Sequence, residues 1–280
     1  MPRKLISFDW AMKKILREKA NFVILEGFLT ELLKFDVKIE EVLESEANQE
    51  TENDKFNRVD LLAKNENGEL ILIEVQHSSE LDYFHRMVYG SSKLISEYIS
   101  KGKDYSQIKK VYSVNIVYFD LGQGDDYIYY GKTDFLGIHQ KDILQLSHNQ
   151  KNRFGDKEVF QIFPEYYILK VNQFDDIAKN SLDEWIYFLK NEEISDNFQA
   201  KGLDSAKETL DVLKLDEKER AVYKRREENK MYKESLISTA VEEAKKEKQL
   251  EIAKTSLENG LDINVVSKIT GLSILEIEKI

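Results

Sequence analysis

The sequence predicts an α/β fold, with a mixed central sheet flanked by helices and a helical C-terminal extension. Three observations carry this prediction. Residues 55–77 have the pattern of two strands joined by a tight Asn/Gly turn. Residues 69–119 then follow the order strand, helix, strand, which at this length implies a parallel crossover. From residue 203 the composition changes, and residues 214–254 are highly charged and poor in apolar side chains.

Composition sets the bounds on the class of protein. The chain has 280 residues, and its 14 Tyr and 14 Phe side chains are enough for a sizeable core. No run approaches the ~18–20 apolar residues of a membrane span, and the N-terminus lacks the apolar core of a signal peptide. We therefore expect a cytoplasmic protein without a membrane partner. Zero Cys excludes disulfides, thiolate metal sites and a Cys nucleophile.

The net charge of −11 bears on the partners. It argues against a protein that coats nucleic acid by charge alone, because non-specific affinity comes from phosphate neutralisation. It leaves room for an enzyme with a local basic groove.

The N-terminal third is expected to supply helices and one strand. Residues 8–34 show helical spacing of apolar side chains, in one or two helices, and Asn21 is placed to cap the second. Glu26 and Glu31 lie on this segment, and we expect both on its solvated face. Residues 37–47 alternate as a strand does, with room for a bulge.

The register of the central hairpin decides whether two acidic residues meet. A two-residue turn at 67–68 would place Asp60 opposite Val75, facing away from Glu74. A three-residue loop at 66–68 places Asp60 directly opposite Glu74 and puts the loop glycine where a left-handed residue is wanted. We therefore predict the three-residue loop. Two carboxylates so close repel each other unless a cation bridges them or one is protonated.

The elements after the hairpin complete the sheet. A helix is predicted over about 82–100 and a central strand, covered on both faces, over 109–119. Residues 125–136 and 158–171 are predicted as peripheral strands, with Pro164 keeping the latter from the centre. Residues 139–157 are expected to form a loop. The predicted apolar stripe of the helix consists of Phe84, Met87, Val88, Ser91, Leu94, Ile95 and Tyr98, with Arg86 and Tyr89 off it.

The C-terminal part has its own pattern. Residues 214–254 hold 12 basic and 10 acidic residues and are predicted as one long charged helix. That helix should end at 259–260, a second should cover 262–269, and Ser273 should cap a third after Gly271. This is a helix-turn-helix-like hairpin. Its few basic residues favour a role in helix packing or in assembly with a second copy of the chain over firm DNA binding.

Five pieces of sequence, taken in order, resemble a known group of enzymes. Together they resemble the PD-(D/E)XK nuclease superfamily and, more narrowly, the recombination-promoting nuclease/putative transposase family. The resemblance implies a restriction-endonuclease-like core. Two positions depart from the superfamily pattern: Val59 stands where it has proline, and Gln76 where it has lysine. The pieces are Phe8-Asp9-Trp10-Ala11-Met12-Lys13-Lys14, Arg58-Val59-Asp60, Glu74-Val75-Gln76, Arg86 with Tyr89, and Ile269-Thr270-Gly271-Leu272-Ser273.

The resemblance also implies a chemistry. Asp60, Glu74 and the carbonyl of Val75 would hold Mg²⁺, or Mn²⁺ as an alternative, because hard cations prefer oxygen ligands. Gln76 would orient a water without bringing a charge. The expected reaction is hydrolysis of phosphodiester bonds in DNA by an endonuclease. Auxiliary roles are assigned to Asp9, Arg86 and Tyr89, although capping of the first helix explains Asp9 at least as well.

The implied organisation has three parts: a PD-(D/E)XK nuclease-like domain over 1–200, a long charged helical linker over 201–256, and the helical hairpin over 257–280. Two other interpretations stay open. In the first, the fold has lost catalysis and serves as a DNA-binding or regulatory protein. Alternatively, Asp60 and Glu74 are paired with Arg58 or Arg86 for structural reasons alone.

Overall fold

The computed structural model describes residues 5–14, 16–43, 60–98 and 104–280. It divides the chain into two compact units, Met1–Lys214 and Leu215–Ile280. Among the described residues, no helix combines the length and the apolar character needed to cross a membrane. Arg58 and Val59, which belong to one of the matched sequence pieces, lie outside the described residues.

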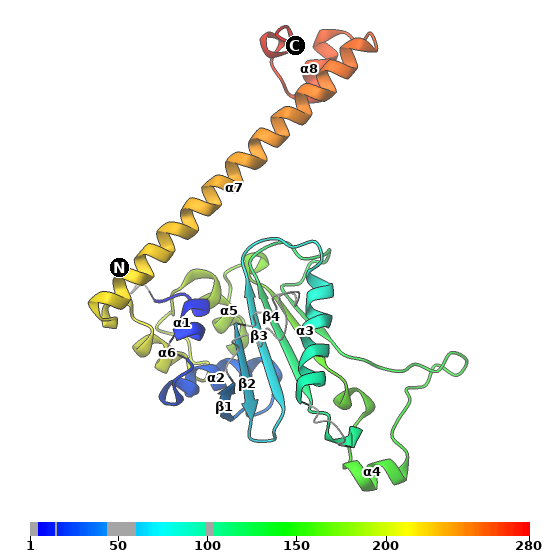
Figure 1. The fold of residues 1–280 in the computed structure, drawn as a ribbon, viewed down its shortest axis with the longest axis vertical. Coiled ribbons are helices and arrows are strands. Elements are labelled where there is room, and N and C mark those ends of the chain that lie inside the picture. Colours follow the sequence, from blue (N-terminus) through cyan, green and yellow to red (C-terminus); the bar gives the residue numbers. More distant parts are fainter. Residues whose placement is uncertain (1–4, 15, 44–59, 99–103) are drawn as a thin grey trace. The chain divides into compact units, whose positions relative to one another are not determined.

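One mixed sheet forms the centre of the first unit (Figure 1). Its spatial order in the described residues is β1-β2-β3-β4-β6-β5. β3 pairs in parallel with β4, and β4 with β6, whereas the remaining neighbours are antiparallel. The predicted α/β fold with a parallel crossover is therefore confirmed. The strands are β1 (Ile39–Leu43), β2 (Leu61–Asn65), β3 (Leu70–Gln76), β4 (Val111–Val117), β5 (Ile128–Gly131) and β6 (Glu165–Lys170).

Three predictions about the second half of the sheet have different outcomes. Every residue of β4 is buried, as expected for a central strand. β5 lies at the edge, but β6 lies between β4 and β5, so its prediction as peripheral is wrong. Pro164 immediately precedes the strand, where a missing amide breaks no ladder bond. Residues 139–157 are not all loop, because α4 (His148–Phe154) begins there behind a capping box formed by Ser147 and Gln150.

Helices cover both faces of the sheet (Figure 1). α3 lies on one face, where Leu94 packs with Leu72 and Val111. α1, α2, α5 and α6 lie on the opposite face (Figure 1), around an aromatic cluster that includes Phe28 and Trp185, whose ring centroids are 5.5 Å apart. Residues 8–34 thus form two α-helices. The bounds are α1 (Phe8–Lys14), α2 (Phe22–Leu33), α3 (Tyr83–Tyr98), α5 (Ser181–Asn191) and α6 (Leu203–Thr209).

The apolar stripe predicted for α3 is correct only in part. Met87, Ser91 and Leu94 are buried against the sheet. Phe84 and Val88 are instead 48% and 57% exposed. The helix is rotated so that Tyr83 and Gly90 face inward, which brings the polar side chains near its N-terminal end over the end of β3. This rotation matters for the site, because it is what carries Arg86 to Glu74.

The sequence predicts Glu26 and Glu31 on the solvated face of α2, but both make contacts with other parts of the fold. Glu26 is buried, its Oε2 lies 3.0 Å from Lys38 Nζ, and its Oε1 accepts a hydrogen bond from the Ile39 amide. Glu31 accepts a hydrogen bond from the Ser181 hydroxyl. The Ile39 contact sits beside a register irregularity in β1, so the predicted bulge is present. Both carboxylates therefore join α2 to neighbouring elements.

The second unit consists of helices only, within its described residues. α7 (Glu217–Glu258) begins with a capping box at Asp216 and ends at Asn259. α8 (Ile263–Thr270) is capped by Asp262 and ends at Gly271, and α9 (Ile274–Ile277) is capped by Ser273. These helix ends confirm the predicted pattern. The small core that joins the three helices is formed by Ala253, Val266, Leu272 and Ile277.

Candidate active site

The loop between β2 and β3 fixes the register on which the site depends. Asn65 donates its amide to the carbonyl of Glu69, and the Gly68 amide donates back to the carbonyl of Asn65. Gly68 has φ +73°, a left-handed conformation that suits glycine. The strands pair Leu61 with Ile73. The predicted three-residue loop is therefore confirmed, and the same register continued by one residue sets Asp60 opposite Glu74.

Asp60 precedes the first residue of β2 and reaches across the hairpin. Its Oδ2 accepts a hydrogen bond of 2.7 Å from the backbone amide of Val75. Its own carbonyl accepts a hydrogen bond of 3.0 Å from Arg17 Nη2. The Asp60 carboxylate thus accepts the Val75 amide in place of a backbone carbonyl of β2. These contacts hold Asp60 at the end of β3, next to Glu74.

Glu74 is the unusual residue of the sheet. Only 4% of it is exposed, and no hydrogen-bond donor in the described part of the chain meets its Oε2. Arg86 Nε lies 3.4 Å from that oxygen. Burial raises the pKa of Glu74 to about 7, against the opposing effect of the Arg86 cation and with the help of the negative charges of Asp60 and Glu80. A cation placed here would favour the ionised form.

A second set of contacts surrounds Gln76 and Arg86. Gln76 Nε2 donates to Glu80 Oε1 at 2.5 Å, and Arg86 Nη1 lies 3.1 and 3.2 Å from the two Glu80 oxygens. The side chain of Arg86 therefore bridges Glu74 and Glu80. Sequence reasoning did not single out Glu80. The sequence feature that could have indicated it is its position, since Glu80 is an acidic residue in the short segment between β3 and α3.

Asn115 and Tyr83 are a hydrogen-bonded pair of polar side chains beside Glu74. Asn115 is the parallel-strand partner of Glu74 and is 1% exposed. Its Oδ1 accepts a hydrogen bond of 3.3 Å from the Tyr83 hydroxyl. Burial and the neighbouring Glu74 raise the pKa of Tyr83, so its hydroxyl stays protonated and donates. Sequence reasoning missed this pair, although a lone asparagine inside an apolar strand was the visible signal.

The auxiliary residues have different positions. Asp9 lies in the first turn of α1 and not at its N-cap, so the capping explanation is wrong. Its Oδ2 lies 3.5 Å from Nε2 of His77, whose ring stacks on Tyr118 at a centroid distance of 4.3 Å. This contact ties α1 to the residue that follows β3. Arg86 lies against Glu74, whereas Tyr89 is 41% exposed on the same helix.

The donor set fits a hard divalent cation in its chemistry. Asp60 and Glu74 supply carboxylate oxygens, and the buried Oε2 of Glu74 has no hydrogen bond to satisfy it within the described residues. The described residues contain no group of three or more His, Asp or Glu side chains that could hold a metal ion. A cation here would thus depend on two carboxylates, a backbone carbonyl and water, which is typical of Mg²⁺.

Fold and site together define a core of the PD-(D/E)XK nuclease type: a mixed sheet flanked by helices, with two acids opposite each other at the end of a central hairpin. Residues 6–240 match the family described as PD-(D/E)XK nuclease family transposase. The chain belongs to this family. Residues 246–280 match the C-terminal HTH domain of the Rpn/YhgA-like nuclease family. Neither the comparison with curated proteins nor that with solved structures found a match.

Proposed function

We propose that the chain is a Mg²⁺-dependent DNA endonuclease of the recombination-promoting type, which hydrolyses phosphodiester bonds. The observation that supports this most is the state of Glu74: a buried carboxylate without a hydrogen-bond donor on Oε2, set opposite Asp60. An unsatisfied buried acid costs free energy, so it is expected where a ligand compensates for it.

Three groups would hold the metal: the carboxylates of Asp60 and Glu74 and the carbonyl of Val75. The Val75 amide points to Asp60. Because the amide and carbonyl of one strand residue point to the same side of the strand, the Val75 carbonyl faces the same edge. When bound, Mg²⁺ would polarise a phosphoryl oxygen and lower the pKa of a coordinated water. Mn²⁺ would satisfy the same oxygen donors.

Two further side chains, Gln76 and Arg86, would orient the attacking water and add positive charge. Gln76 carries no charge, and its amide is held by Glu80, so it can orient a water by hydrogen bonding. Arg86 carries a permanent charge within 3.4 Å of Glu74. We propose that it provides the cation that lysine provides in the superfamily pattern, because a guanidinium fork suits a phosphate.

DNA is the proposed partner of both units. The match of residues 246–280 to an HTH domain supports a contribution of the C-terminal helices to DNA binding. That segment holds five lysines against six acidic residues. The positive charge left for phosphate is therefore small, and assembly with a second copy through these helices stays a prediction.

The test is nicking of supercoiled plasmid DNA in Mg²⁺. We expect Asp60→Asn and Glu74→Gln to reduce the rate by about 10²–10³-fold, because each removes charge stabilisation of the reacting phosphate. Glu26→Gln is the matched control: it also neutralises a buried glutamate, but one that Lys38 and the Ile39 amide already satisfy. Nicking by the Asp60→Asn, Glu74→Gln double variant at the wild-type rate would overturn the proposal.

A second candidate function is a nuclease fold that binds DNA without cleaving it. Two observations favour it: Gln76 stands at the lysine position, and Arg86 already lies against both Glu74 and Glu80. This candidate predicts DNA binding that is independent of Mg²⁺ and of Glu74. The plasmid assay, run beside a DNA-binding measurement on the same preparations, separates the two.

A further inference from the structure

A hollow of about 550 Å³ opens at the opposite end of the sheet from Glu74. Lys110, which immediately precedes β4, lies in its wall, whereas the strand partner of Glu74 is Asn115, five residues further along β4. At about 3.3 Å per strand residue, the two places are about 16 Å apart along the strand. The hollow is therefore separate from the candidate active site.

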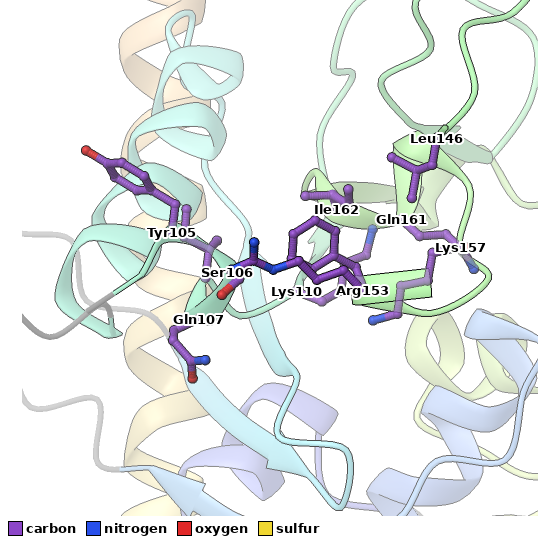
Figure 2. A pocket seen from close by; sticks show the side chains of 11 residues that line it. Tyr105, Ser106, Gln107, Lys110, Leu146, Arg153, Lys157, Gln161 and Ile162 are labelled. Atoms are coloured by element: carbon purple, nitrogen blue, oxygen red, sulfur yellow. The ribbon is translucent and has the colours of Figure 1, made fainter. Parts of the chain in front are cut away.

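Its lining differs in charge from the rest of the protein. The chain carries a net charge of −11, yet the described residues that line the hollow include three cations and no acid. Figure 2 shows residues 105–107 on one side and Leu146, Gln161 and Ile162 on the other, with Lys110 and Arg153 between them. Such a lining favours an anionic ligand.

The three cations are not equivalent. The amine of Lys110 is fully used: it lies 2.7 Å from Glu165 Oε1 and donates to two backbone carbonyls. Lys157 is exposed and lines the same hollow as Lys110. Burial lowers the pKa of the Lys110 amine, and the charge of Lys157 adds a smaller lowering effect. Arg153 lies 3.3 Å from Asp104 in an exposed pair. A pair of this kind is worth about 1 kcal/mol or less, so an anionic ligand can replace Asp104.

The remaining wall is apolar and aromatic. Phe154 and Ile162 line the hollow and are 41% and 47% exposed. Arg153 lies over the Phe154 ring, 5.4 Å from its centroid, so the cationic and aromatic groups are adjacent. Gln107 and Gln161 add amide groups that can hydrogen-bond to a heterocycle. The volume lies in the range of sites for small ligands, roughly 300–1,000 Å³.

We propose that this hollow binds a nucleotide unit, with the phosphate on Arg153 and Lys157 and the base against Phe154 and Ile162. The chemistry is the same for a free nucleotide and for one nucleotide of a single-stranded DNA. Aromatic stacking beside cations is how proteins hold single strands, and it needs no metal ion. The site is thus independent of the proposed cleavage.

The test uses the intact chain in EDTA, so that no cleavage occurs and failure of the proposed nuclease activity does not affect the result. Fluorescence anisotropy follows the binding of labelled adenosine 5′-monophosphate and of a labelled 12-nucleotide oligothymidylate. We expect the double variant Arg153→Gln, Lys157→Gln to weaken binding at least tenfold, and Phe154→Ala to weaken it about tenfold, because stacking on this ring is lost.

Lys151→Gln is the matched control, because Lys151 is on α4 as Arg153 is, but its amine is paired with Asp156 and it does not line the hollow. It should change binding less than twofold. Thermal unfolding of each variant verifies that these exposed substitutions leave the fold intact. Equal weakening by Lys151→Gln, binding unaffected by the double variant, or no binding of either probe would overturn the proposal.

Competition identifies the source of the nucleotide. If unlabelled oligothymidylate displaces the labelled monophosphate more effectively than adenosine 5′-monophosphate does, the site takes single-stranded DNA. If the oligonucleotide fails to displace it, the site takes the free nucleotide. Either result supports the proposal. Inorganic phosphate that competes as well as adenosine 5′-monophosphate would contradict it, because the base would then add nothing.

Discussion

Two buried glutamates lie on the same sheet in opposite states. Glu165, at the start of β6, accepts hydrogen bonds from the hydroxyls of Tyr130 and Tyr167 and lies 2.7 Å from Lys110 Nζ. Glu74, at the end of β3, has an arginine at 3.4 Å and no hydrogen bond on Oε2 within the described residues. Both are at most 6% exposed.

The contrast between Glu165 and Glu74 shows that burial of an acid is not in itself a mark of function. The interior of a protein tolerates a carboxylate that is paired and hydrogen-bonded, and Glu165 meets both conditions. Glu74 has a charged partner in Arg86 but no hydrogen bond on Oε2 within the described residues. Its neighbours Asp60 and Glu80 add negative charge that disfavours its ionised form. The fold holds Glu74 in a position that costs stability, which is expected where a ligand is to be bound.

The largest expected effect comes from changing which residue faces Glu74. Deleting Glu66 shortens the hairpin loop to two residues, so that Asp60 turns away from Glu74. We expect Mg²⁺-dependent nicking to fall as far as in Asp60→Asn, about 10²–10³-fold. Inserting two glycines after Glu66 keeps the parity and should retain most of the activity. Equal activity in the two loop variants would show that the register is irrelevant.

Removal of Arg86 should have the next largest effect. Arg86→Met deletes the cation beside Glu74 and is expected to slow nicking about 10–100-fold. Because Arg86 lowers the pKa of Glu74, the midpoint of the pH–rate profile should also move to higher pH. Lys93→Met is the control, because Lys93 is on the same helix and is paired with Glu97 at the surface, away from Glu74; it should leave both the rate and the midpoint unchanged. If the midpoint of the pH–rate profile does not shift in Arg86→Met, Arg86 does not control the ionisation of Glu74.

A smaller effect concerns stability without metal. The pKa of Glu74 is raised in the folded state from 4.5 to about 7, so the folded state binds the extra proton and stability falls as pH rises through that window. Glu74→Gln should therefore stabilise the metal-free protein at pH 8, by on the order of 2–3 kcal/mol, and by little at pH 4.5. Thermal unfolding in EDTA at both pH values measures this.

Glu165→Gln provides the opposite case in the same experiment. It removes the charged partner of buried Lys110 and should destabilise the protein at both pH values, by up to about 3 kcal/mol. If Glu74→Gln destabilised the protein as much as Glu165→Gln does at pH 8, the Glu74 carboxylate would be as well satisfied as that of Glu165. The difference between the two glutamates would then be contradicted.

The sequence was informative where a local rule decides the outcome. The loop length followed from the position of Gly68 and from the alternation of strand residues, and it placed Asp60 opposite Glu74. The ends of the C-terminal helices followed from Asp262, Gly271 and Ser273, whose roles depend on neighbouring backbone groups alone. Short-range chemistry of this kind is visible in the chain itself.

The sequence was less informative where distant segments meet. The rotation of α3, which exposes Phe84, depends on how the helix packs on the sheet. The position of Arg86 near Glu74 was expected from the family resemblance and not from the helix pattern. Glu80 and Asn115 entered the site through packing as well. β6 was placed at the periphery because Pro164 was counted against it, although the proline lies just outside the strand. The rotation of α3 and the positions of Glu80 and Asn115 depend on tertiary packing that no local pattern encodes, whereas the error on β6 came from a strand boundary one residue away.

Calorimetric titration of Mg²⁺ into the wild-type chain at pH 7 tests whether Asp60 and Glu74 together hold a metal ion. We expect one site, accompanied by proton release as Glu74 ionises, which appears as a dependence of the heat on the buffer. Binding should be lost in Asp60→Asn and in Glu74→Gln and retained in Glu26→Gln. Unchanged Mg²⁺ binding in the Asp60→Asn and Glu74→Gln variants would contradict the assignment of these two carboxylates as the metal site.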